Sequence, residues 1–222
     1  MHGLAQPAAG RAPLGLMTTL PIYWPEAHDA GEMLQARETP AQVRETLETR
    51  FELVPLDTLE AQTLRGHERL LLAQPRALSP IENVALDEWV RAGGRLLLFA
   101  DPMLTHHSHF GVGDKRRAQD VVLLSPILTH WGLQLSFDPA QPPAERHVEM
   151  AGVEVPVALA GTLDILPGGR CELSGEAILA SCRIGRGSVT VVADAALLDE
   201  AEDGASRRRS EAILRLTALA FD

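Results

Sequence analysis

Three short runs decide the fold: Arg69-Leu-Leu-Leu-Ala73, Ser79-Pro-Ile-Glu82 and Arg95-Leu-Leu-Leu-Phe-Ala-Asp101. The first and third are continuous apolar runs, typical of strands whose two faces are both covered in a parallel sheet. The second is a capping box with proline at the first helical position, which predicts that a helix begins there. Gly93-Gly94 ends this helix. Strand, helix, glycine stop and strand make a βαβ unit, so the two strands should run parallel.

The same criteria predict the elements on either side of this unit. We expect one α/β domain with an open, mostly parallel sheet and helices on both faces, preceded by a flexible lead over residues 1–13. Proline and glycine between residues 138 and 176 predict a β-rich insertion. Further strands are expected at 14–20, 51–56, 133–137, 177–182 and 189–194, the last two as an antiparallel hairpin, and helices from Thr39-Pro40, over 121–131 and over 207–221. In the helix after Ser79 the apolar side is predicted to carry Ile81, Val84, Ala85 and Trp89.

Composition and charge exclude several classes of partner. The 222 residues are 45% hydrophobic and 23% charged with a net charge of −10, as expected for a globular chain that phosphate backbones and anionic lipids repel. The two basic clusters, Lys115–Arg117 and Arg207–Arg209, are short and are interpreted as solvated faces. No apolar run approaches the ~20 residues of a membrane span. We therefore expect no nucleic-acid partner, no direct membrane insertion and a cytoplasmic location.

The cysteines and serines do not form a recognisable nucleophile. Cys171 lies in a glycine-rich stretch and Cys182 inside an apolar strand pattern, so neither occupies a strand-to-helix elbow. No G-x-S-x-G motif occurs. A disulfide is one alternative for the two cysteines, but reduced thiols suit a cytoplasmic chain better. The sequence gives no nucleophile for a hydrolase of this architecture.

Polar residues follow several of the predicted strands. Thr18 and Thr19 end the first, Asp101 follows the strand at residue 95, and Asp194 ends the last. Open α/β sheets bind ligands at the carboxyl ends of their parallel strands, so these four residues are candidates for holding a polyol, an amine or a cation. The alternative is that both aspartates accept hydrogen bonds from backbone amides of the turns that follow them.

Histidines are concentrated in the polar loop over 103–120. His106, His107 and His109 can share a Zn²⁺ or Ni²⁺ ion, with Asp101 or Asp114 as an oxygen ligand. The alternative is that they are solvated loop side chains, since such spacing is nonspecific. We expect no cofactor apart from this zinc hypothesis.

The loop after the first strand contains an aromatic residue among acids. Trp24 lies in one short stretch with Tyr23, Glu26, His28 and Asp29, a combination that suits recognition of a sugar or a peptide. Trp24 is therefore a candidate ligand-binding residue. The alternative is that it packs on the neighbouring helix and anchors the loop.

Three segments together resemble a known family. They are Met17–Pro21, Leu70–Asp101 and the run from Gly185-Arg-Gly-Ser-Val-Thr-Val-Val-Ala-Asp194 through Leu198. They resemble the domain of ABC-type uncharacterised transport proteins, which include gliding-motility auxiliary proteins and the related GIFT domain of intraflagellar transport proteins. The resemblance implies a flavodoxin-like, class I glutamine amidotransferase-like fold without amidotransferase activity.

These observations lead to two hypotheses of function. The first is a non-catalytic binding or assembly module, associated with an ABC-type transport system, that holds a protein partner or a small polar ligand at the carboxyl-end crevice. The second is a metal-assisted or carboxylate-dependent hydrolase or transferase that uses Asp101, Asp194 and the loop from His106 to His109. A homodimer through an edge strand or the final helix is compatible with both.

Overall fold

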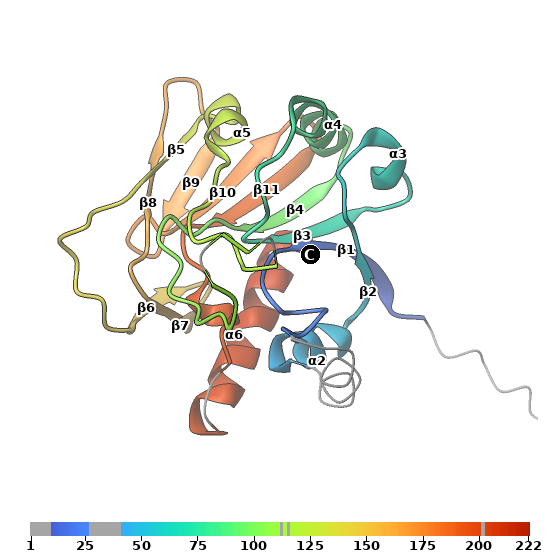
Figure 1. Cartoon of the computed structure of the whole chain (residues 1–222). Coiled ribbons are helices and arrows are strands. Elements are labelled where there is room, and N and C mark those ends of the chain that lie inside the picture. Colours follow the sequence, from blue (N-terminus) through green and yellow to red (C-terminus); the bar gives the residue numbers. More distant parts are fainter. Residues whose placement is uncertain (1–9, 27–40, 112, 115, 201–202) are drawn as a thin grey trace, which may run out of the picture.

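A computed structural model describes residues 10–26, 41–111, 113–114, 116–200 and 203–222 (Figure 1). Several residues used in the predictions lie outside these ranges, namely His28, Asp29, Thr39, Pro40 and Lys115. No helix among the described residues is long and apolar enough to cross a membrane.

A seven-stranded sheet forms the centre of the molecule (Figure 1). Its order is β2 (Phe51–Pro55), β1 (Ala12–Thr18), β3 (Arg69–Ala73), β4 (Arg95–Phe99), β11 (Gly187–Val192), β10 (Leu179–Ile184) and β9 (Cys171–Ser174). The pairs from β2 to β11 are parallel, whereas β10 and β9 each run antiparallel to the strand before them in this order. Two separate antiparallel pairs join β5 (Leu133–Ser136) to β8 (Thr162–Ile165), and β6 (Arg146–Met150) to β7 (Val153–Val157).

Helices pack against the sheet and enclose its core. They are α2 (Gln42–Glu48), α3 (Ala61–Leu64), α4 (Pro80–Arg91), α5 (Ser125–His130) and α6 (Asp203–Phe221), with a 3₁₀ turn η1 (Ala196–Leu198). In Figure 1, α2 and α6 lie below the sheet and α4 lies above it. The leucines of β3 and β4 are at most 1% exposed, as expected for strands covered on both faces.

The βαβ unit that the sequence predicts is confirmed. β3 and β4 pair in parallel over their whole lengths, and α4 connects them. The Ser79 hydroxyl accepts a hydrogen bond from the Glu82 amide at 3.3 Å, and the Glu82 carboxylate accepts one from the Ser79 amide at 2.9 Å. Glu82 also forms a 2.7 Å ion pair with Arg76, which holds the pKa of Glu82 low, at about 2. The first turn of α4 is therefore fixed at both ends of the capping box.

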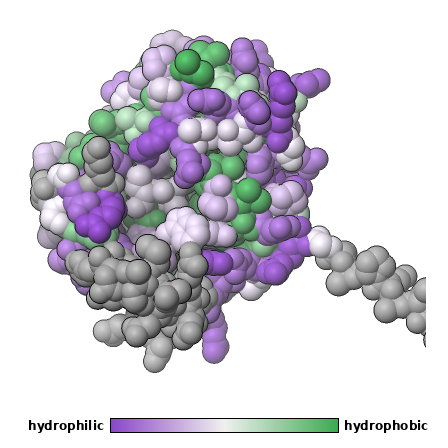
Figure 2. Space-filling model, turned by 45° about the vertical axis from the view of Figure 1, so that its right-hand side comes forward, coloured by the Kyte–Doolittle hydropathy of each residue, from purple (hydrophilic) through white to green (hydrophobic). Residues whose placement is uncertain are grey.

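The predicted apolar side of α4 is partly wrong. Ile81 is 71% exposed and Val84 59% exposed, whereas Leu86 and Val90 are buried. The helix turns its Leu86 side toward the sheet because that stripe continues to Val90. Figure 2 shows hydrophobic side chains exposed among hydrophilic ones at the top of the molecule, the region of α4 in Figure 1.

The predicted fold class, an open, mostly parallel, flavodoxin-like or class I glutamine amidotransferase-like sheet, is wrong. The sheet is mixed, and from Leu133 to Val192 the chain forms seven strands and no helix. Among the described residues there are five α-helices, of which α3 and α5 span only four and six residues. The reason is that the chain forms antiparallel pairs after β4, and of its later strands only β11 joins the parallel part of the sheet.

Several element boundaries also differ from the predictions. β1 begins at Ala12, within the predicted flexible lead, and α5 begins at Ser125, later than the predicted residue 121. α6 begins at Asp203, before the predicted residue 207. The short α3 was not predicted, because its four residues give no helical period. The hairpin of β10 and β11 is confirmed as antiparallel.

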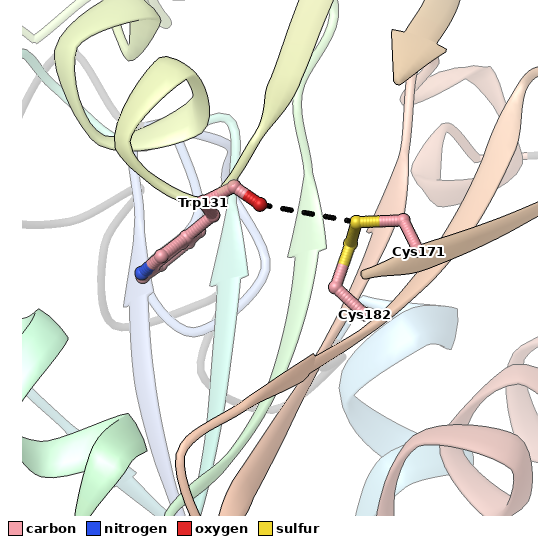
Figure 3. Close-up of a disulfide and its surroundings, with 3 residues drawn as sticks. All are labelled: Trp131, Cys171 and Cys182. Carbon is pink, nitrogen blue, oxygen red and sulfur yellow. Dashed lines mark hydrogen bonds between the residues drawn. A yellow bond between two sulfur atoms is a disulfide. The ribbon is translucent and has the colours of Figure 1, made fainter. Parts of the chain in front are cut away.

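The two cysteines form a disulfide, contrary to the interpretation of reduced thiols (Figure 3). Cys171 on β9 lies directly opposite Cys182 on β10 in the antiparallel register. The Cys171 Sγ atom also contacts the Trp131 carbonyl oxygen at 3.9 Å, just after α5. The sequence concealed this pairing because it depends on strand register, and the bond fastens the edge strand to the sheet.

Candidate functional site

The carboxyl ends of β1, β3, β4 and β11 lie side by side at one rim of the sheet. Thr18 ends β1, and Asp101 and Asp194 follow β4 and β11 closely. The rim therefore brings together the strand ends whose polar residues the sequence singled out. The hydrogen bonds of these polar side chains differ from one residue to the next.

Gln74, the residue after β3, joins these strand ends. Its side chain is fully buried and exchanges two hydrogen bonds with the backbone of Asp101, at 2.9 and 3.0 Å. Its Nε2 also donates to the Gln119 carbonyl at 2.8 Å, and its own carbonyl accepts from the Thr19 hydroxyl at 2.5 Å. Its φ of +45° is uncommon for a residue with a side chain. Sequence analysis missed Gln74, because no motif marks a glutamine that bonds to backbone.

Asp101 and Asp194 are buried and satisfied by backbone amides. Asp101 is 0% exposed and accepts from the amides of Met103 at 2.8 Å and Ala195 at 3.0 Å. Asp194 is 2% exposed and accepts from the amides of Ala158 and Ala196. Burial raises the pKa of Asp101 to about 6 and, together with the charge of Asp101, raises the pKa of Asp194 well above its usual value. These contacts match the alternative in which both aspartates accept hydrogen bonds from backbone amides and do not hold a ligand.

Thr18 and Thr19 also bond to backbone. The Thr18 hydroxyl accepts from the Leu20 amide at 2.9 Å, in the turn that follows β1. The Thr19 hydroxyl donates to Gln74 and accepts from the Gln119 amide at 3.1 Å. Both threonines therefore order the rim.

A pocket of about 470 Å³ lies next to this rim. Its walls come from the loops after β1, β4 and η1 together with the start of α2, so it sits at the carboxyl end of the parallel strands. Its polar lining includes Glu26, His106, His107, His109, Asp199 and Glu200, and its apolar lining includes Leu20, Ile22, Val43 and Leu198. None of the residues Thr18, Thr19, Trp24, Asp101 and Asp194 lines it. The three candidate histidines therefore share a pocket, and the other predicted site residues lie outside it.

His106 lies between two carboxylates in this pocket. Its Nδ1 is 2.8 Å from the Asp199 carboxylate, and its Nε2 is 4.0 Å from Glu26 Oε1. The hydrogen bond to Asp199 raises the pKa of His106, and the charges of Asp199, Glu26 and Glu200 add to this effect while burial opposes it. These contacts therefore favour the imidazolium form more than water does.

Two polar atoms in this cluster lack a hydrogen-bond partner among the described residues. They are Glu26 Oε1 and His106 Nε2, which belong to side chains only 10% and 16% exposed. The second oxygen of Glu26 accepts from the His109 amide at 2.7 Å. Each side chain is thus held by one of its polar atoms, and the remaining two atoms, Glu26 Oε1 and His106 Nε2, face each other at 4.0 Å.

Among the described residues, the structure adds no further metal ligand to the histidines of the loop. Among the described residues, no group of three or more His, Cys, Asp or Glu side chains is arranged to hold a metal ion. The oxygen ligands expected from the sequence are engaged elsewhere, because Asp101 accepts two amides and Asp114 pairs with Arg116 at 2.8 Å. Zinc binding by His106, His107 and His109 stays a prediction.

Trp24 lies outside the pocket and is 54% exposed. Its ring packs edge to face on the ring of Tyr23, with the ring centroids 4.9 Å apart. The guanidinium of Arg44 lies over the Tyr23 ring, 4.4 Å from its centroid. Trp24 therefore belongs to an aromatic and cationic cluster beside α2.

Two residues of the pocket cluster were not candidates from the sequence alone. Asp199 follows η1 and meets a histidine 93 positions earlier, and local spacing gives no sign of such a contact. Glu26 was noted only as an acid near Trp24. Their place in the chain was the one sign of a shared site, because both residues come after strands of the parallel part of the sheet.

A family model described as "ABC-type uncharacterized transport system" matches residues 11–156. The match includes β1, the βαβ unit and the histidine loop. A comparison with curated proteins finds no match.

Solved structures share the fold at low sequence identity. An exo-β-1,4-mannosidase from Opitutaceae bacterium strain TAV5 is 13% identical with a TM-score of 0.56, over 94% of this chain and 36% of that one. A β-galactosidase from Rahnella sp. R3 is 11% identical with a TM-score of 0.53, over 95% and 31%. The mmIFT52 N-terminal domain is 16% identical with a TM-score of 0.54, over 95% and 98%. The chain spans about a third of the two glycosidases, and at such identities the likeness concerns the fold alone.

Proposed function

The chain belongs to the family described as an ABC-type uncharacterized transport system, and we propose that it serves such a system as a non-catalytic binding module. The pocket formed by the loops after β1, β4 and η1 is the proposed ligand site. In this role the chain holds a small polar ligand at the carboxyl ends of its parallel strands.

One observation carries this proposal: histidines and carboxylates, among them His106, Glu26 and Asp199, line one pocket at the carboxyl ends of the parallel strands. Open α/β sheets bind ligands at this end of their parallel strands, so the position of the pocket favours a ligand site. The pocket volume of about 470 Å³ lies in the usual range for small-molecule sites, roughly 300–1,000 Å³. A small ligand therefore fits the site better than a protein surface does.

A second candidate function, a hydrolase or transferase, rests on a different contact. Asp199 accepts from His106 as the orienting carboxylate of a histidine base would. The two carboxylates first assigned to this chemistry, Asp101 and Asp194, are buried and bonded to backbone amides. The raised pKa of His106 also shifts it toward the protonated form, which cannot act as a base. The contacts thus favour binding over catalysis.

The test is a thermal-shift screen of the full chain with neutral polyols, polyamines, divalent cations and phosphates, followed by product analysis of every compound that binds. We expect stabilisation by one chemical class, loss of that stabilisation in His106→Gln, and no product. His147→Gln on β6 is the matched control, because it makes the same exchange at an exposed histidine that does not line the pocket. Turnover that disappears in His106→Gln would establish the enzyme instead.

The cytoplasmic location predicted from the sequence is a separate proposal, and the disulfide weighs against it. Disulfides such as Cys171–Cys182 persist in oxidising compartments and are rare in the cytosol. Alkylation of cells before lysis, followed by mass spectrometry, distinguishes the two locations. Full labelling of both cysteines supports the cytoplasm, and a protected, bridged pair supports an oxidising compartment.

A further inference from the structure

A second cavity lies beside α6, which packs on β4 and β11. Its volume is about 630 Å³, and Leu219 of α6 forms one wall. It shares no lining residue with the pocket at the carboxyl ends of the parallel strands. Its polar lining comes from β9, β10 and β11 and from the residue before β9, and it consists of Arg170, Glu172, Ser181, Arg183, Ser188 and Thr190.

Strand register places these six side chains on one face of the sheet. The Arg183 amide donates to the Arg170 carbonyl at 3.0 Å, so the two arginines face each other in the register that pairs Cys171 with Cys182. Successive side chains of a strand point to opposite faces, so the arginines point away from the face that holds the disulfide. The same alternation brings the other four side chains to the face of the arginines, in the opposed pairs Glu172–Ser181, Ser181–Thr190 and Arg183–Ser188.

The disulfide holds the two arginines opposite each other. Its cysteines are their neighbours in the chain, and Figure 3 shows the bond that joins them. β9 lies at the edge of the sheet, with β10 as its neighbour, so the cross-link fixes the edge strand in this register. Arg170 therefore stays close to Arg183 before a ligand arrives, which reduces the ordering that binding requires.

The two guanidinium groups carry positive charge that no described residue pairs with. Both side chains are exposed, and neither forms an ion pair or a hydrogen bond with another described residue. Like charges directly opposite each other on paired strands are destabilising. Glu172 supplies one negative charge on this face, and Arg215, one turn before Leu219 on the same side of α6, supplies a further positive one. The wall of the cavity is therefore positively charged.

The net charge of −10 does not cancel this local charge. At physiological ionic strength the Debye length is ~8 Å, so carboxylates farther away are largely screened while groups in contact with a ligand are not. An anion that enters the cavity is therefore governed by the charges of its wall.

A phosphate monoester matches these donors. Guanidinium groups bind oxyanions through paired N–H donors, and a hydroxyl such as that of Ser188 can donate to a further oxygen. Phosphate has enough oxygens for both arginines and a hydroxyl, whereas the two oxygens of a carboxylate are matched by one guanidinium. The cavity volume lies in the usual range for small-molecule sites, roughly 300–1,000 Å³, which leaves room for an organic group beside Leu219.

We propose that this cavity binds a small soluble phosphorylated molecule, whose phosphate group lies between Arg170 and Arg183. The proposal goes beyond the proposed function, because the cavity uses none of the residues of the pocket assigned to that function.

Isothermal titration of the full chain at low ionic strength tests the proposal with phenyl phosphate, glycerol phosphate and inorganic phosphate. Citrate and acetate serve as carboxylate probes. Sedimentation with vesicles of phosphatidylcholine and phosphatidic acid tests a lipid phosphate. We expect one of the two phosphate monoesters to bind more tightly than the carboxylates, and no binding to the vesicles.

Three variants examine the charges of the cavity wall. Arg170→Gln and Arg183→Gln should each weaken binding of the phosphate monoester about 5-fold or more, since each removes hydrogen bonds to a charged group. Glu172→Gln should strengthen it about 2-fold, because it removes a charge of the same sign as the ligand. Arg65→Gln is the matched control, because it makes the same exchange at an exposed arginine, at the end of α3, that does not line the cavity.

The other outcomes separate this proposal from the proposed function. Binding that is unchanged in both arginine variants would overturn it, because the phosphate would lie elsewhere. Binding that is lost in His106→Gln and kept in Arg183→Gln would place the phosphate in the other pocket, which supports the proposed function and overturns this proposal alone. Citrate bound as tightly as the monoesters, binding to vesicles alone, or no binding by any probe would each overturn it and leave the proposed function standing.

Discussion

Two groups of titratable residues lie near the same end of the sheet and differ in how their polar atoms are hydrogen-bonded. At the rim, Asp101 and Asp194 each accept two backbone amides and are almost fully buried. In the pocket, Glu26 and His106 each keep one polar atom without a partner among the described residues. The first group holds loops in place, whereas the second leaves two polar atoms without a hydrogen bond to the described residues. Position at a strand end therefore does not by itself distinguish a structural carboxylate from a binding one, whereas an account of its hydrogen bonds does.

The largest expected effect at the rim comes from Gln74→Ala. The substitution leaves the buried Asp101 amide and the half-buried Gln119 carbonyl without partners, whereas the Asp101 carbonyl still accepts from the Val122 amide. At roughly 1–3 kcal/mol for each unsatisfied group, we expect a loss of roughly 4 kcal/mol in the free energy of unfolding. Denaturation by urea measures it. A loss below about 1 kcal/mol would mean that water reaches the rim and that it is not a closed structural unit.

Asp194→Ala should have the next largest effect. It removes the acceptor of the Ala158 and Ala196 amides, and we expect a loss of roughly 3 kcal/mol in the free energy of unfolding. Asp194→Asn is the matched control, since it keeps one oxygen acceptor and should lose less. Equal losses in the two variants would show that the charge and not the hydrogen bonds matters, which would remove the contrast with the pocket.

The pKa of Asp101 predicts a pH dependence of stability. Its folded pKa of about 6 lies above the ordinary value of 3.8, so the folded state binds the proton more tightly than the unfolded state does. Stability from this group is therefore present at low pH and is lost as pH rises through about 4 to 6, by about 3 kcal/mol in total and about 1 kcal/mol between pH 5 and pH 7.5. Urea denaturation across this range measures the slope, and Asp101→Asn should reduce it without removing it, since the pKa of Asp194 is also raised. A slope that is unchanged in Asp101→Asn would contradict the assignment to Asp101.

The parts predicted from the sequence are those that local patterns determine. The capping box at Ser79 and the apolar runs of β3 and β4 were sufficient for the βαβ unit, because each carries its signal within a few residues. The antiparallel edge strand β9 and the Cys171–Cys182 bond depend on register between distant segments, so composition gave only a β-rich insertion.

The candidate site follows the same rule. The rule that open α/β sheets bind ligands at the carboxyl ends of their strands was enough to identify the rim and the histidine loop, since both lie where β4 ends. The contacts of His106 with Asp199 and Glu26 join residues 93 and 80 positions apart, and only the fold brings them together. The sequence also could not show that Gln74, and not a charged residue, connects the ends of β3 and β4.

The smallest effect on stability is expected in the pocket, where Glu26→Gln should change the free energy of unfolding by less than about 0.5 kcal/mol. The side-chain amide of glutamine keeps an oxygen that accepts from the backbone amide of His109. Its nitrogen replaces Glu26 Oε1, an atom that has no hydrogen bond to any described residue. The substitution weakens one charge contact of His106, whose main partner, Asp199, remains. Parallel urea denaturation of Glu26→Gln and Asp194→Asn makes the comparison direct, because each exchanges one carboxylate oxygen for an amide nitrogen. If Glu26→Gln proved as destabilising as Asp194→Asn, Glu26 would be a structural residue like those of the rim, and the proposed ligand site would lose one of its candidate polar groups.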